Sequence, residues 1–137
     1  PRYFSSAASD VYKRQVLMDI QTIKKRRDFL KGNNAPYAAM PSVVIQSYMR
    51  TDEVVETDES VMMGITCSKK VGNAVKRNRA KRRLREAGKI VLREIGIKKT
   101  NYIFIARKDT TIKVKFTDLC SDIETGIKKI YGQEKGK

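Results

Sequence analysis

The residues with the clearest chemical potential form one basic run at residues 68–85. From Lys69 to Arg85 the run holds nine lysines and arginines and no acid, more than half of the formal net charge of +15. Five of the nine are arginines, whose planar guanidinium suits bidentate contacts to phosphate and stacking on bases. The run therefore predicts a surface for a polyanion, and nucleic acid is the first candidate.

The same run has the pattern of an amphipathic helix. Its apolar residues recur three or four positions apart, which predicts one buried stripe. The stripe consists of Ala80, Leu84, Ala87, Val91 and Ile95. On a helical wheel Asn78, Arg82 and Arg85 fall opposite this stripe, and the other cations cover its flanks. A solvated helix usually mixes both charge signs, whereas here the first acid is Glu86, which favours a phosphate-binding face.

Both ends of the basic helix are marked by residue type. Gly72 and Asn73 indicate a turn from strand to helix, and the Asn73 side chain can accept an amide of the first turn. Free amides near Asn73 also favour an anion. Gly96 is expected to end the helix. Because a strand is expected before this helix, a helix-turn-helix DNA reader is disfavoured, although charge alone does not separate RNA from DNA.

The surrounding pattern predicts one α+β domain in the order helix, strand, strand, helix, strand, helix. Besides the basic helix, the expected elements are a helix at 22–30, strands at 43–49, 61–67 and 102–106, and a closing amphipathic helix at 116–130. Pro36 and Pro41 are expected to bracket a loop, and the acidic residues 51–60 a solvated turn. Residues 1–17 show no period and are expected to be a disordered or non-native extension, with the domain at 18–137.

Composition excludes several chemistries. The chain has no histidine, which removes the usual general base near neutral pH and any His-ligated metal. Cys67 and Cys120 are too few for a four-cysteine zinc site and are expected to be reduced core thiols. Asp118 and Asp122 lie one helical turn apart and could bind Mg²⁺, but compensation of the helix dipole is the favoured interpretation. We therefore predict neither a catalytic residue nor a metal site in the protein.

The chain shows no signal for export or a membrane. No apolar stretch reaches the roughly 18 residues that a span requires, and the first residues lack the apolar centre of a signal peptide. A cytoplasmic location is therefore expected. Binding to an anionic membrane is disfavoured because the basic helix carries no Trp, Phe or Tyr.

The basic run resembles the signature of the bacterial ribonuclease P protein subunit. The resemblance is carried by GITCSKKVGNAVKRNRAKRRLRE at residues 64–86, around Arg77, Asn78 and Arg79. Weaker similarities are found in IKKRRDF at residues 23–29, in YIFIARK at residues 102–108 and in the closing helix. Together they cover about residues 19–131.

The resemblance implies a fold and a function. The implied fold is a single-domain α/β sandwich that is ribosomal-protein-S5-domain-2-like, with a left-handed βαβ crossover. The implied protein is an accessory subunit, monomeric in the holoenzyme, that binds a catalytic RNA and the 5′ leader of precursor tRNA. The RNA would carry the active site and most of the Mg²⁺ for removal of the leader, so the protein itself would need no cofactor. A structural rRNA-binding protein of the ribosome is the main alternative that composition leaves open.

Residue by residue, the run and the resemblance together predict two surfaces. The predicted RNA-binding residues are Lys69, Lys70, Asn73, Lys76, Arg77, Asn78, Arg79, Lys81, Arg82, Arg83 and Arg85. The predicted leader-binding cleft contains Phe29, Tyr48, Tyr102 and Arg107. Many relatives have a second cleft aromatic where this chain has Asn33, so leader stacking is expected either to be weaker or to be supplied by Tyr48 or Tyr102.

Overall fold

The structure is a computed structural model that describes residues 20–50, 61–97 and 99–135, so the predicted extension 1–17 and acidic turn 51–60 lie outside the described residues. The strands are β1 Ile20–Thr22, β2 Tyr37–Ala39, β3 Val43–Met49, β4 Val61–Thr66 and β5 Thr100–Ala106. The α-helices are α2 Arg26–Lys31, α3 Ala74–Ile95, α4 Thr110–Lys113 and α5 Phe116–Lys135, with short 3₁₀ turns η2 Gly32–Asn34 and η4 Lys69–Val71. The predicted α+β class is confirmed.

The strands form one sheet in the order β1-β4-β5-β3-β2. β4 runs parallel to β1 and β5, while β3 runs antiparallel to β5 and β2. The parallel neighbours β4 and β5 are connected through α3, which makes a βαβ unit. The left-handed sense of that crossover stays a prediction from the resemblance.

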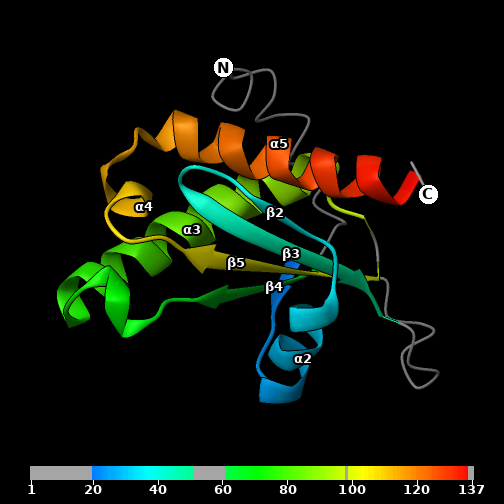
Figure 1. Cartoon of the computed structure of the whole chain (residues 1–137), viewed down its shortest axis with the longest axis horizontal. Coiled ribbons are helices and arrows are strands. Elements are labelled where there is room, and N and C mark those ends of the chain that lie inside the picture. Colours follow the sequence, from blue (N-terminus) through cyan, green and yellow to red (C-terminus); the bar gives the residue numbers. More distant parts are fainter. Residues whose placement is uncertain (1–19, 51–60, 98, 136–137) are drawn as a thin grey trace.

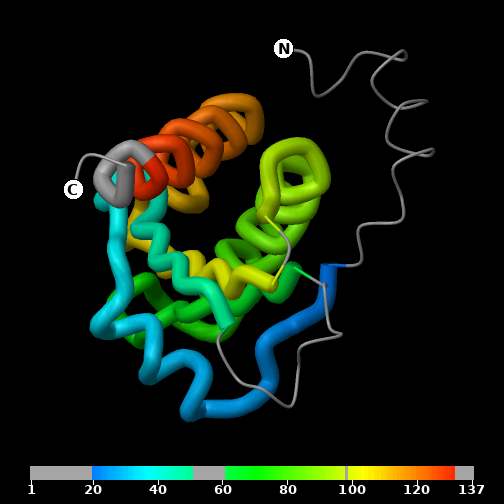
Figure 2. Tube along the Cα trace, turned by 90° about the vertical axis from the view of Figure 1, so that its right-hand side faces the viewer, coloured from blue at the N-terminus to red at the C-terminus, as the bar shows by residue number. Residues whose placement is uncertain are grey.

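The two long helices cover one face of the sheet, and α2 lies against the other (Figures 1 and 2). Strand alternation explains this arrangement, because successive side chains point to opposite faces. An added Cβ on Gly126 of α5 would lie 2.4 Å from Ile45 Cδ1, so Ile45 faces the long helices. An added Cβ on Gly32, just after α2, would lie 2.4 Å from Ile103 Cδ1 and 2.9 Å from Gln46 Oε1. Ile103 and Gln46 therefore belong to the α2 face, which we call the open face.

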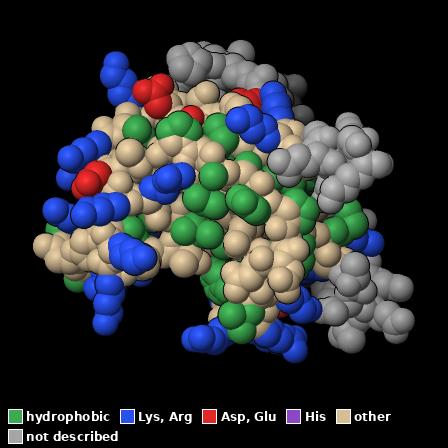
Figure 3. All heavy atoms as spheres, viewed as in Figure 1, with side chains coloured by type: hydrophobic (Ala, Val, Ile, Leu, Met, Phe, Trp, Pro, Cys, Tyr) green, Lys and Arg blue, Asp and Glu red, His purple; other side chains and the backbone are tan. Residues whose placement is uncertain are grey.

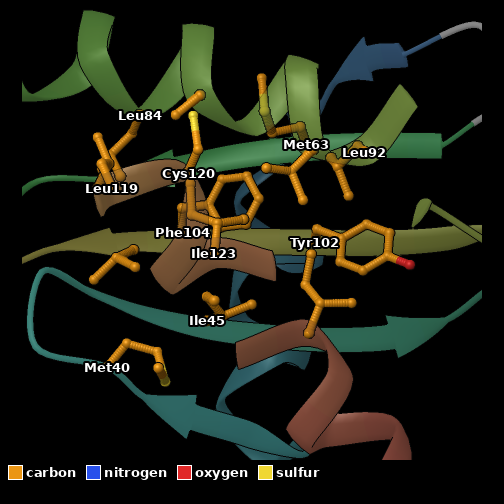
Figure 4. Packing of buried hydrophobic residues seen from close by; sticks show 14 of the residues in the cluster. Met40, Ile45, Met63, Leu84, Leu92, Tyr102, Phe104, Leu119, Cys120 and Ile123 are labelled. Carbon is orange, nitrogen blue, oxygen red and sulfur yellow. The ribbon is translucent and has the colours of Figure 1, made fainter. Parts of the chain in front are cut away.

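The core lies between the sheet and the two long helices (Figure 4). Ile45, Phe104 and Tyr102 come from the sheet, while Leu84 and Ile123 come from α3 and α5, and all five are fully buried. Within the part of the chain that the structure describes, no helix is both long and apolar enough to cross a membrane.

The predicted element order lacked the short elements β1, β2 and α4. The predicted helix at 22–30 was wrong at its start, because residues 20–22 form β1 and α2 begins only at Arg26. The expected loop between Pro36 and Pro41 contains β2. α4 was also missed. These are elements of three or four residues, too short to show a period, and the two strands exist because of pairing with β4 and β3.

Candidate RNA-binding surfaces

A tight connection between β4 and α3 positions the start of the basic run. β4 ends at Thr66, and the η4 turn anchors the chain through Val71, whose side chain is only 3% exposed. Gly72 follows with φ 146 and ψ −158, a backbone conformation that is essentially restricted to glycine. A Cβ at this position would lie 2.7 Å from Lys76 Cδ, so the absence of a side chain also lets the Lys76 stem cross the turn.

The predicted N-cap is confirmed. Asn73 Oδ1 accepts a hydrogen bond from the backbone N–H of Lys76 at 3.0 Å, which satisfies one amide of the first helical turn. The Asn73 side chain is itself exposed. Its oxygen is engaged in the cap, so its amide nitrogen is the group that it can offer to a ligand.

The predicted wheel of α3 is also confirmed. Ala80, Leu84, Ala87 and Val91 are fully buried, and Ile95 is half-buried at the end of the helix. The predicted RNA-binding residues that are exposed are Lys69, Lys70, Asn73, Lys76, Asn78, Arg79, Arg82 and Arg85. Lysine and arginine side chains gather on the side of the molecule where the N-terminal turns of α3 and α4 lie (Figure 3). The sequence of α3 thus produces a cationic helix face whose charges no acid within the run offsets.

Three predicted RNA-binding residues are only half-exposed: Arg77, Lys81 and Arg83. Arg83 donates a hydrogen bond from Nη2 to the Val114 carbonyl, so it ties α3 to the segment between α4 and α5. The Nε atoms of Arg77 and Arg83 are buried and have no hydrogen-bond partner among the described residues. Arg83 thus serves packing at least as much as ligand binding, a role that the sequence alone did not reveal.

Both cysteines are free. Cys120 is fully buried, and burial together with the nearby Glu124 carboxylate raises the pKa of its thiol to about 11. Cys67 is half-buried, and burial raises its thiol pKa although the cations of Lys81 and Arg77 act in the opposite direction. The two thiols are therefore protonated near neutral pH and are poor nucleophiles.

The predicted cleft aromatic Phe29 lies where α2 meets the sheet. Its ring packs on Gly64 of β4, where an added Cβ would lie 2.6 Å from Phe29 Cε1. The ring is half-buried, whereas the neighbouring Leu30 is 50% exposed. Phe29 therefore holds α2 against the sheet and presents only part of its ring to solvent.

Tyr48 fastens the same helix to the open face. Its hydroxyl donates to the Asp28 carbonyl at 2.7 Å and accepts from Asn101 Nδ2 at 2.9 Å. Asn101 Oδ1 in turn accepts from Arg50 Nη1 at 2.6 Å. These bonds link α2 with β3 and β5, so the half-buried Tyr48 is a positioning residue as well as a candidate contact.

The prediction for Tyr102 was wrong. Its side chain is 0% exposed in the core between the sheet and the long helices. Its hydroxyl accepts from the backbone N–H of Ile97 at 3.0 Å and also contacts the Tyr131 hydroxyl. The continuous apolar run of β5 concealed which residues face the open side, and strand alternation places Asn101, Ile103 and Ile105 there instead.

The other predicted cleft cation, Arg107, is exposed at the end of β5. Its Nη1 donates to the Met40 carbonyl at 3.0 Å, so the guanidinium lies beside the β2–β3 connection. The open face also carries an aromatic that sequence reasoning missed. Tyr37 is 61% exposed and pairs with Gln46, while its neighbour Ala38 is buried. The sequence YAAM at residues 37–40 has no alternation of polar and apolar residues that could have signalled this, and pairing with β3 decides which way Tyr37 faces.

A pocket of about 190 Å³ connects the α2 region with the basic helix. Phe29 lines it from α2, and Lys81 and Arg85 line it from α3. The remaining lining residues are Thr22, Ile23, Met63 and Ile65. In the space-filling view, the molecule is hollowed between α2 and the N-terminal part of α3 (Figure 3). An aromatic ring and two cations therefore border the same pocket.

The fold and these surfaces define a small α+β protein with a cationic helix beside a partly aromatic sheet face. This combination is typical of RNA-binding proteins. A family model described as Ribonuclease P matches residues 17–131, and the chain belongs to this family. Family membership makes it an accessory subunit of an RNA-processing endoribonuclease, with the ribonuclease P RNA as its partner.

Individual relatives agree with the family assignment. The ribonuclease P protein component of Ruegeria pomeroyi is 40% identical over 112 residues, which cover 82% of this chain and 87% of that protein. The Caulobacter vibrioides protein of the same name is 36% identical over 129 residues, or 87% and 84% of the two chains.

Solved structures show the same fold. The Staphylococcus aureus ribonuclease P protein has a TM-score of 0.61 and 28% identity, over 78% of this chain and 92% of that one. The Thermotoga maritima ribonuclease P protein has a TM-score of 0.60, over 77% of this chain and 93% of that one. At 22% identity it supports the fold alone.

Proposed function

We propose that this protein binds the catalytic RNA of ribonuclease P through the basic face of α3 and the 5′ leader of precursor tRNA through the open face. It does so as a monomer in a cytoplasmic holoenzyme that cleaves the leader from the tRNA. The observation that carries the proposal is the pocket bordered by Phe29, Lys81 and Arg85. At this pocket the open face adjoins the basic face of α3, so one protein can contact the catalytic RNA and its substrate together.

The basic face has the properties that a folded RNA backbone requires. Arg79, Arg82 and Arg85 are exposed on successive turns of a helix whose opposite side is fixed in the core. Residues one turn apart are separated by about 5 Å along the axis, so several phosphates can be met together. The rigid backbone lowers the conformational entropy that binding costs, and Asn78 adds an uncharged hydrogen-bonding group among the cations.

The open face suits a single strand. Tyr37 and part of Phe29 offer ring surface on which bases can stack, and Tyr48 lies on the same side of the sheet. Arg107 adds a cation at the end of β5. Tyr37 takes the role that we expected Tyr48 or Tyr102 to fill in place of the aromatic missing at Asn33.

We assign the Mg²⁺ ions to the partner RNA. Among residues 20–50, 61–97 and 99–135, no group of three or more acidic, thiol or imidazole side chains could hold a metal. The protein contributes by holding RNA and leader in position, and its cations offset the mutual repulsion of two polyanions. No step of the cleavage is assigned to a protein side chain.

Reconstitution tests the proposed function. The protein is mixed with bacterial ribonuclease P RNA and precursor tRNA at a low Mg²⁺ concentration, where the RNA alone cleaves slowly. We expect faster release of the leader and an unchanged cleavage site. If the protein binds ribosomal RNA as tightly and leaves the cleavage rate unchanged, the alternative of a structural ribosomal protein is favoured instead.

Changing Tyr37 to Ala tests the open face. We expect the holoenzyme to bind leader-bearing precursor about 5- to 150-fold more weakly, because stacking on an aromatic contributes about 1–3 kcal/mol per base. Binding of mature tRNA should stay unchanged. Tyr37→Phe is the matched control, since it keeps the ring and should keep leader affinity. Equal losses for precursor and mature tRNA would contradict a leader contact at this position.

A further inference from the structure

A second pocket lies at the N-terminal end of α3, where α4 packs against that helix. It holds about 140 Å³ and is lined by Val75, Lys76, Arg79, Asp109, Ile112 and Lys113. It shares none of its lining residues with the pocket at Phe29. Two of its residues are aliphatic, three are cationic and one is acidic.

Val75 gives the pocket a property that phosphate binding does not need. Its side chain is 76% exposed although it lies in the middle of the most cationic segment of the chain. Ile112, half-buried, supplies the second aliphatic surface. Phosphate oxygens gain nothing from aliphatic carbon, whereas the flat face of a nucleobase does. The apolar part of the pocket therefore points to a base.

The polar residues of the pocket suit the rest of a nucleotide. Lys76, Arg79 and Lys113 can neutralise its phosphates. Asp109 begins α4 with φ 65, and its carboxylate makes no capping hydrogen bond to that helix. A carboxylate accepts a hydrogen bond from an exocyclic amino group and repels a carbonyl oxygen, so Asp109 favours cytosine over uracil.

The size of the pocket selects among bases. A cavity of about 150 Å³ accepts one benzene ring, so a pocket of about 140 Å³ matches a single six-membered ring. That is the size of a pyrimidine, whereas the two-ring system of a purine would extend out of the pocket.

We propose that this pocket receives one unstacked pyrimidine of the partner RNA, preferably cytosine. The base lies on Val75 and Ile112, its amino group faces Asp109, and the flanking phosphates meet Lys76, Arg79 and Lys113. The proposal rests on the proposed function, because it takes the ribonuclease P RNA as the source of the base. It adds a base-reading contact to a surface otherwise explained by charge.

Changing Val75 to Ala tests the apolar contact. We expect the affinity for ribonuclease P RNA to fall about four- to fifteenfold, as for loss of one or two methylene-sized groups from an apolar contact. The salt dependence of binding should be unchanged, because no ion pair is lost. Alanine favours a helix more than valine does, so the variant should fold, and urea unfolding checks this.

Ile97→Ala is the matched control. Ile97 is an aliphatic residue that is 40% exposed beyond the other end of α3, and that end lies about 30 Å from Val75 along the helix axis. Its replacement should leave RNA affinity unchanged. If wild-type protein binds the RNA and Val75→Ala binds equally well, the pocket inference fails while the proposed function stands. If wild-type protein does not bind the RNA, the proposed function fails.

Free nucleotides test the pocket without the RNA. Methyl resonances of Val75 and Ile112 are followed by NMR in the full chain during titration with cytidine monophosphate, uridine monophosphate or inorganic phosphate. We expect the largest shifts with cytidine monophosphate and a smaller response to uridine monophosphate. An Asp109→Asn variant should lose most of this difference. Equal responses to the two nucleotides overturn the assignment to cytosine, and a response to phosphate alone overturns the base pocket.

Discussion

Consecutive residues of the basic run lie in different environments. Arg77 is half-buried, with its Nε atom enclosed, whereas Asn78 and Arg79 are exposed. Arg83 bonds to the Val114 carbonyl, whereas Arg82 beside it faces solvent. Charge type alone therefore does not assign a role to a residue. The side of the helix on which it lies decides whether it can reach a ligand.

Arg79 is the residue on which phosphate binding can be tested most directly. Arg79→Ala should weaken binding to ribonuclease P RNA and reduce the slope of log K against log salt by about one unit, as for loss of one phosphate contact. Arg93→Ala is the matched control, because Arg93 is exposed on the same helix outside the basic run. Filter binding at several salt concentrations measures both. An unchanged slope for Arg79→Ala would place its side chain away from the phosphates.

Cys120 gives a prediction on pH. Because its folded-state pKa is raised from 9.0 to about 11, the folded protein keeps the thiol proton at a pH where the unfolded chain has lost it. The contribution to stability is complete below about pH 9 and is lost as pH rises through 11, with a slope of up to about 1.4 kcal/mol per pH unit. Urea unfolding at pH 8 to 11 measures it. Cys120→Ala should show a shallower decline, and an identical decline in both proteins would contradict the assignment to this thiol.

At the scale of elements, α2 depends on the sheet for its position. It has only six residues and no buried side chain, too short to be stable as an isolated helix in water. Phe29 on Gly64 and the Tyr48 hydroxyl on the Asp28 carbonyl attach it to the open face. The part of the candidate leader surface that α2 contributes therefore depends on these contacts.

Tyr48→Phe tests that attachment. It removes the hydroxyl that joins Asp28 to Asn101, and we expect a loss of about 1–2 kcal/mol in the free energy of unfolding. Amide hydrogen exchange in α2 should become faster. Tyr37→Phe, which removes the hydroxyl of an exposed tyrosine, should change neither. Unchanged exchange in α2 after Tyr48→Phe would contradict a positioning role for this hydroxyl.

At the scale of the whole molecule, the apolar core and the exposed basic side chains lie in different parts of the protein. The core fills the space between the sheet and the long helices, while the exposed cations of the basic run lie on the η4 turn and on the outer side of α3. Six basic residues of the run are exposed: Lys69, Lys70, Lys76, Arg79, Arg82 and Arg85. This separation lets a chain with a net charge of +15 fold compactly and still present its cations together.

Salt dependence tests the whole surface. If each of the six exposed cations meets one phosphate, log K for ribonuclease P RNA should fall with log salt at a slope of about −5. Measurements between about 50 and 200 mM salt cover the range where this effect is large. A protein in which all six are replaced by Gln should fold, and its slope should be much shallower because only its remaining phosphate contacts contribute. A wild-type slope shallower than about −2 would contradict a phosphate-binding face.

The sequence by itself determined the basic helix. Ala80, Leu84, Ala87 and Val91 recur at helical spacing, and Asn73 caps the first turn, so the periodicity and the cap were readable without any distant contact. The residue order around Arg77, Asn78 and Arg79 also indicated the family, which the match to residues 17–131 confirms.

Tertiary structure alone decided the open face. β1 and β2 form by pairing with strands far along the chain or across a short turn, and local pattern in three residues cannot show that. The continuous apolar run of β5 did not reveal that Tyr102 is buried or which of its neighbours face α2. The same holds for Tyr37 and for the two pockets, since each is made of residues brought together by the packing of α2 or α4. The periodicity of a helix sequence indicates which of its faces is buried. In a sheet that is covered on both faces, the strands are apolar throughout, so only the elements packed against each face distinguish them.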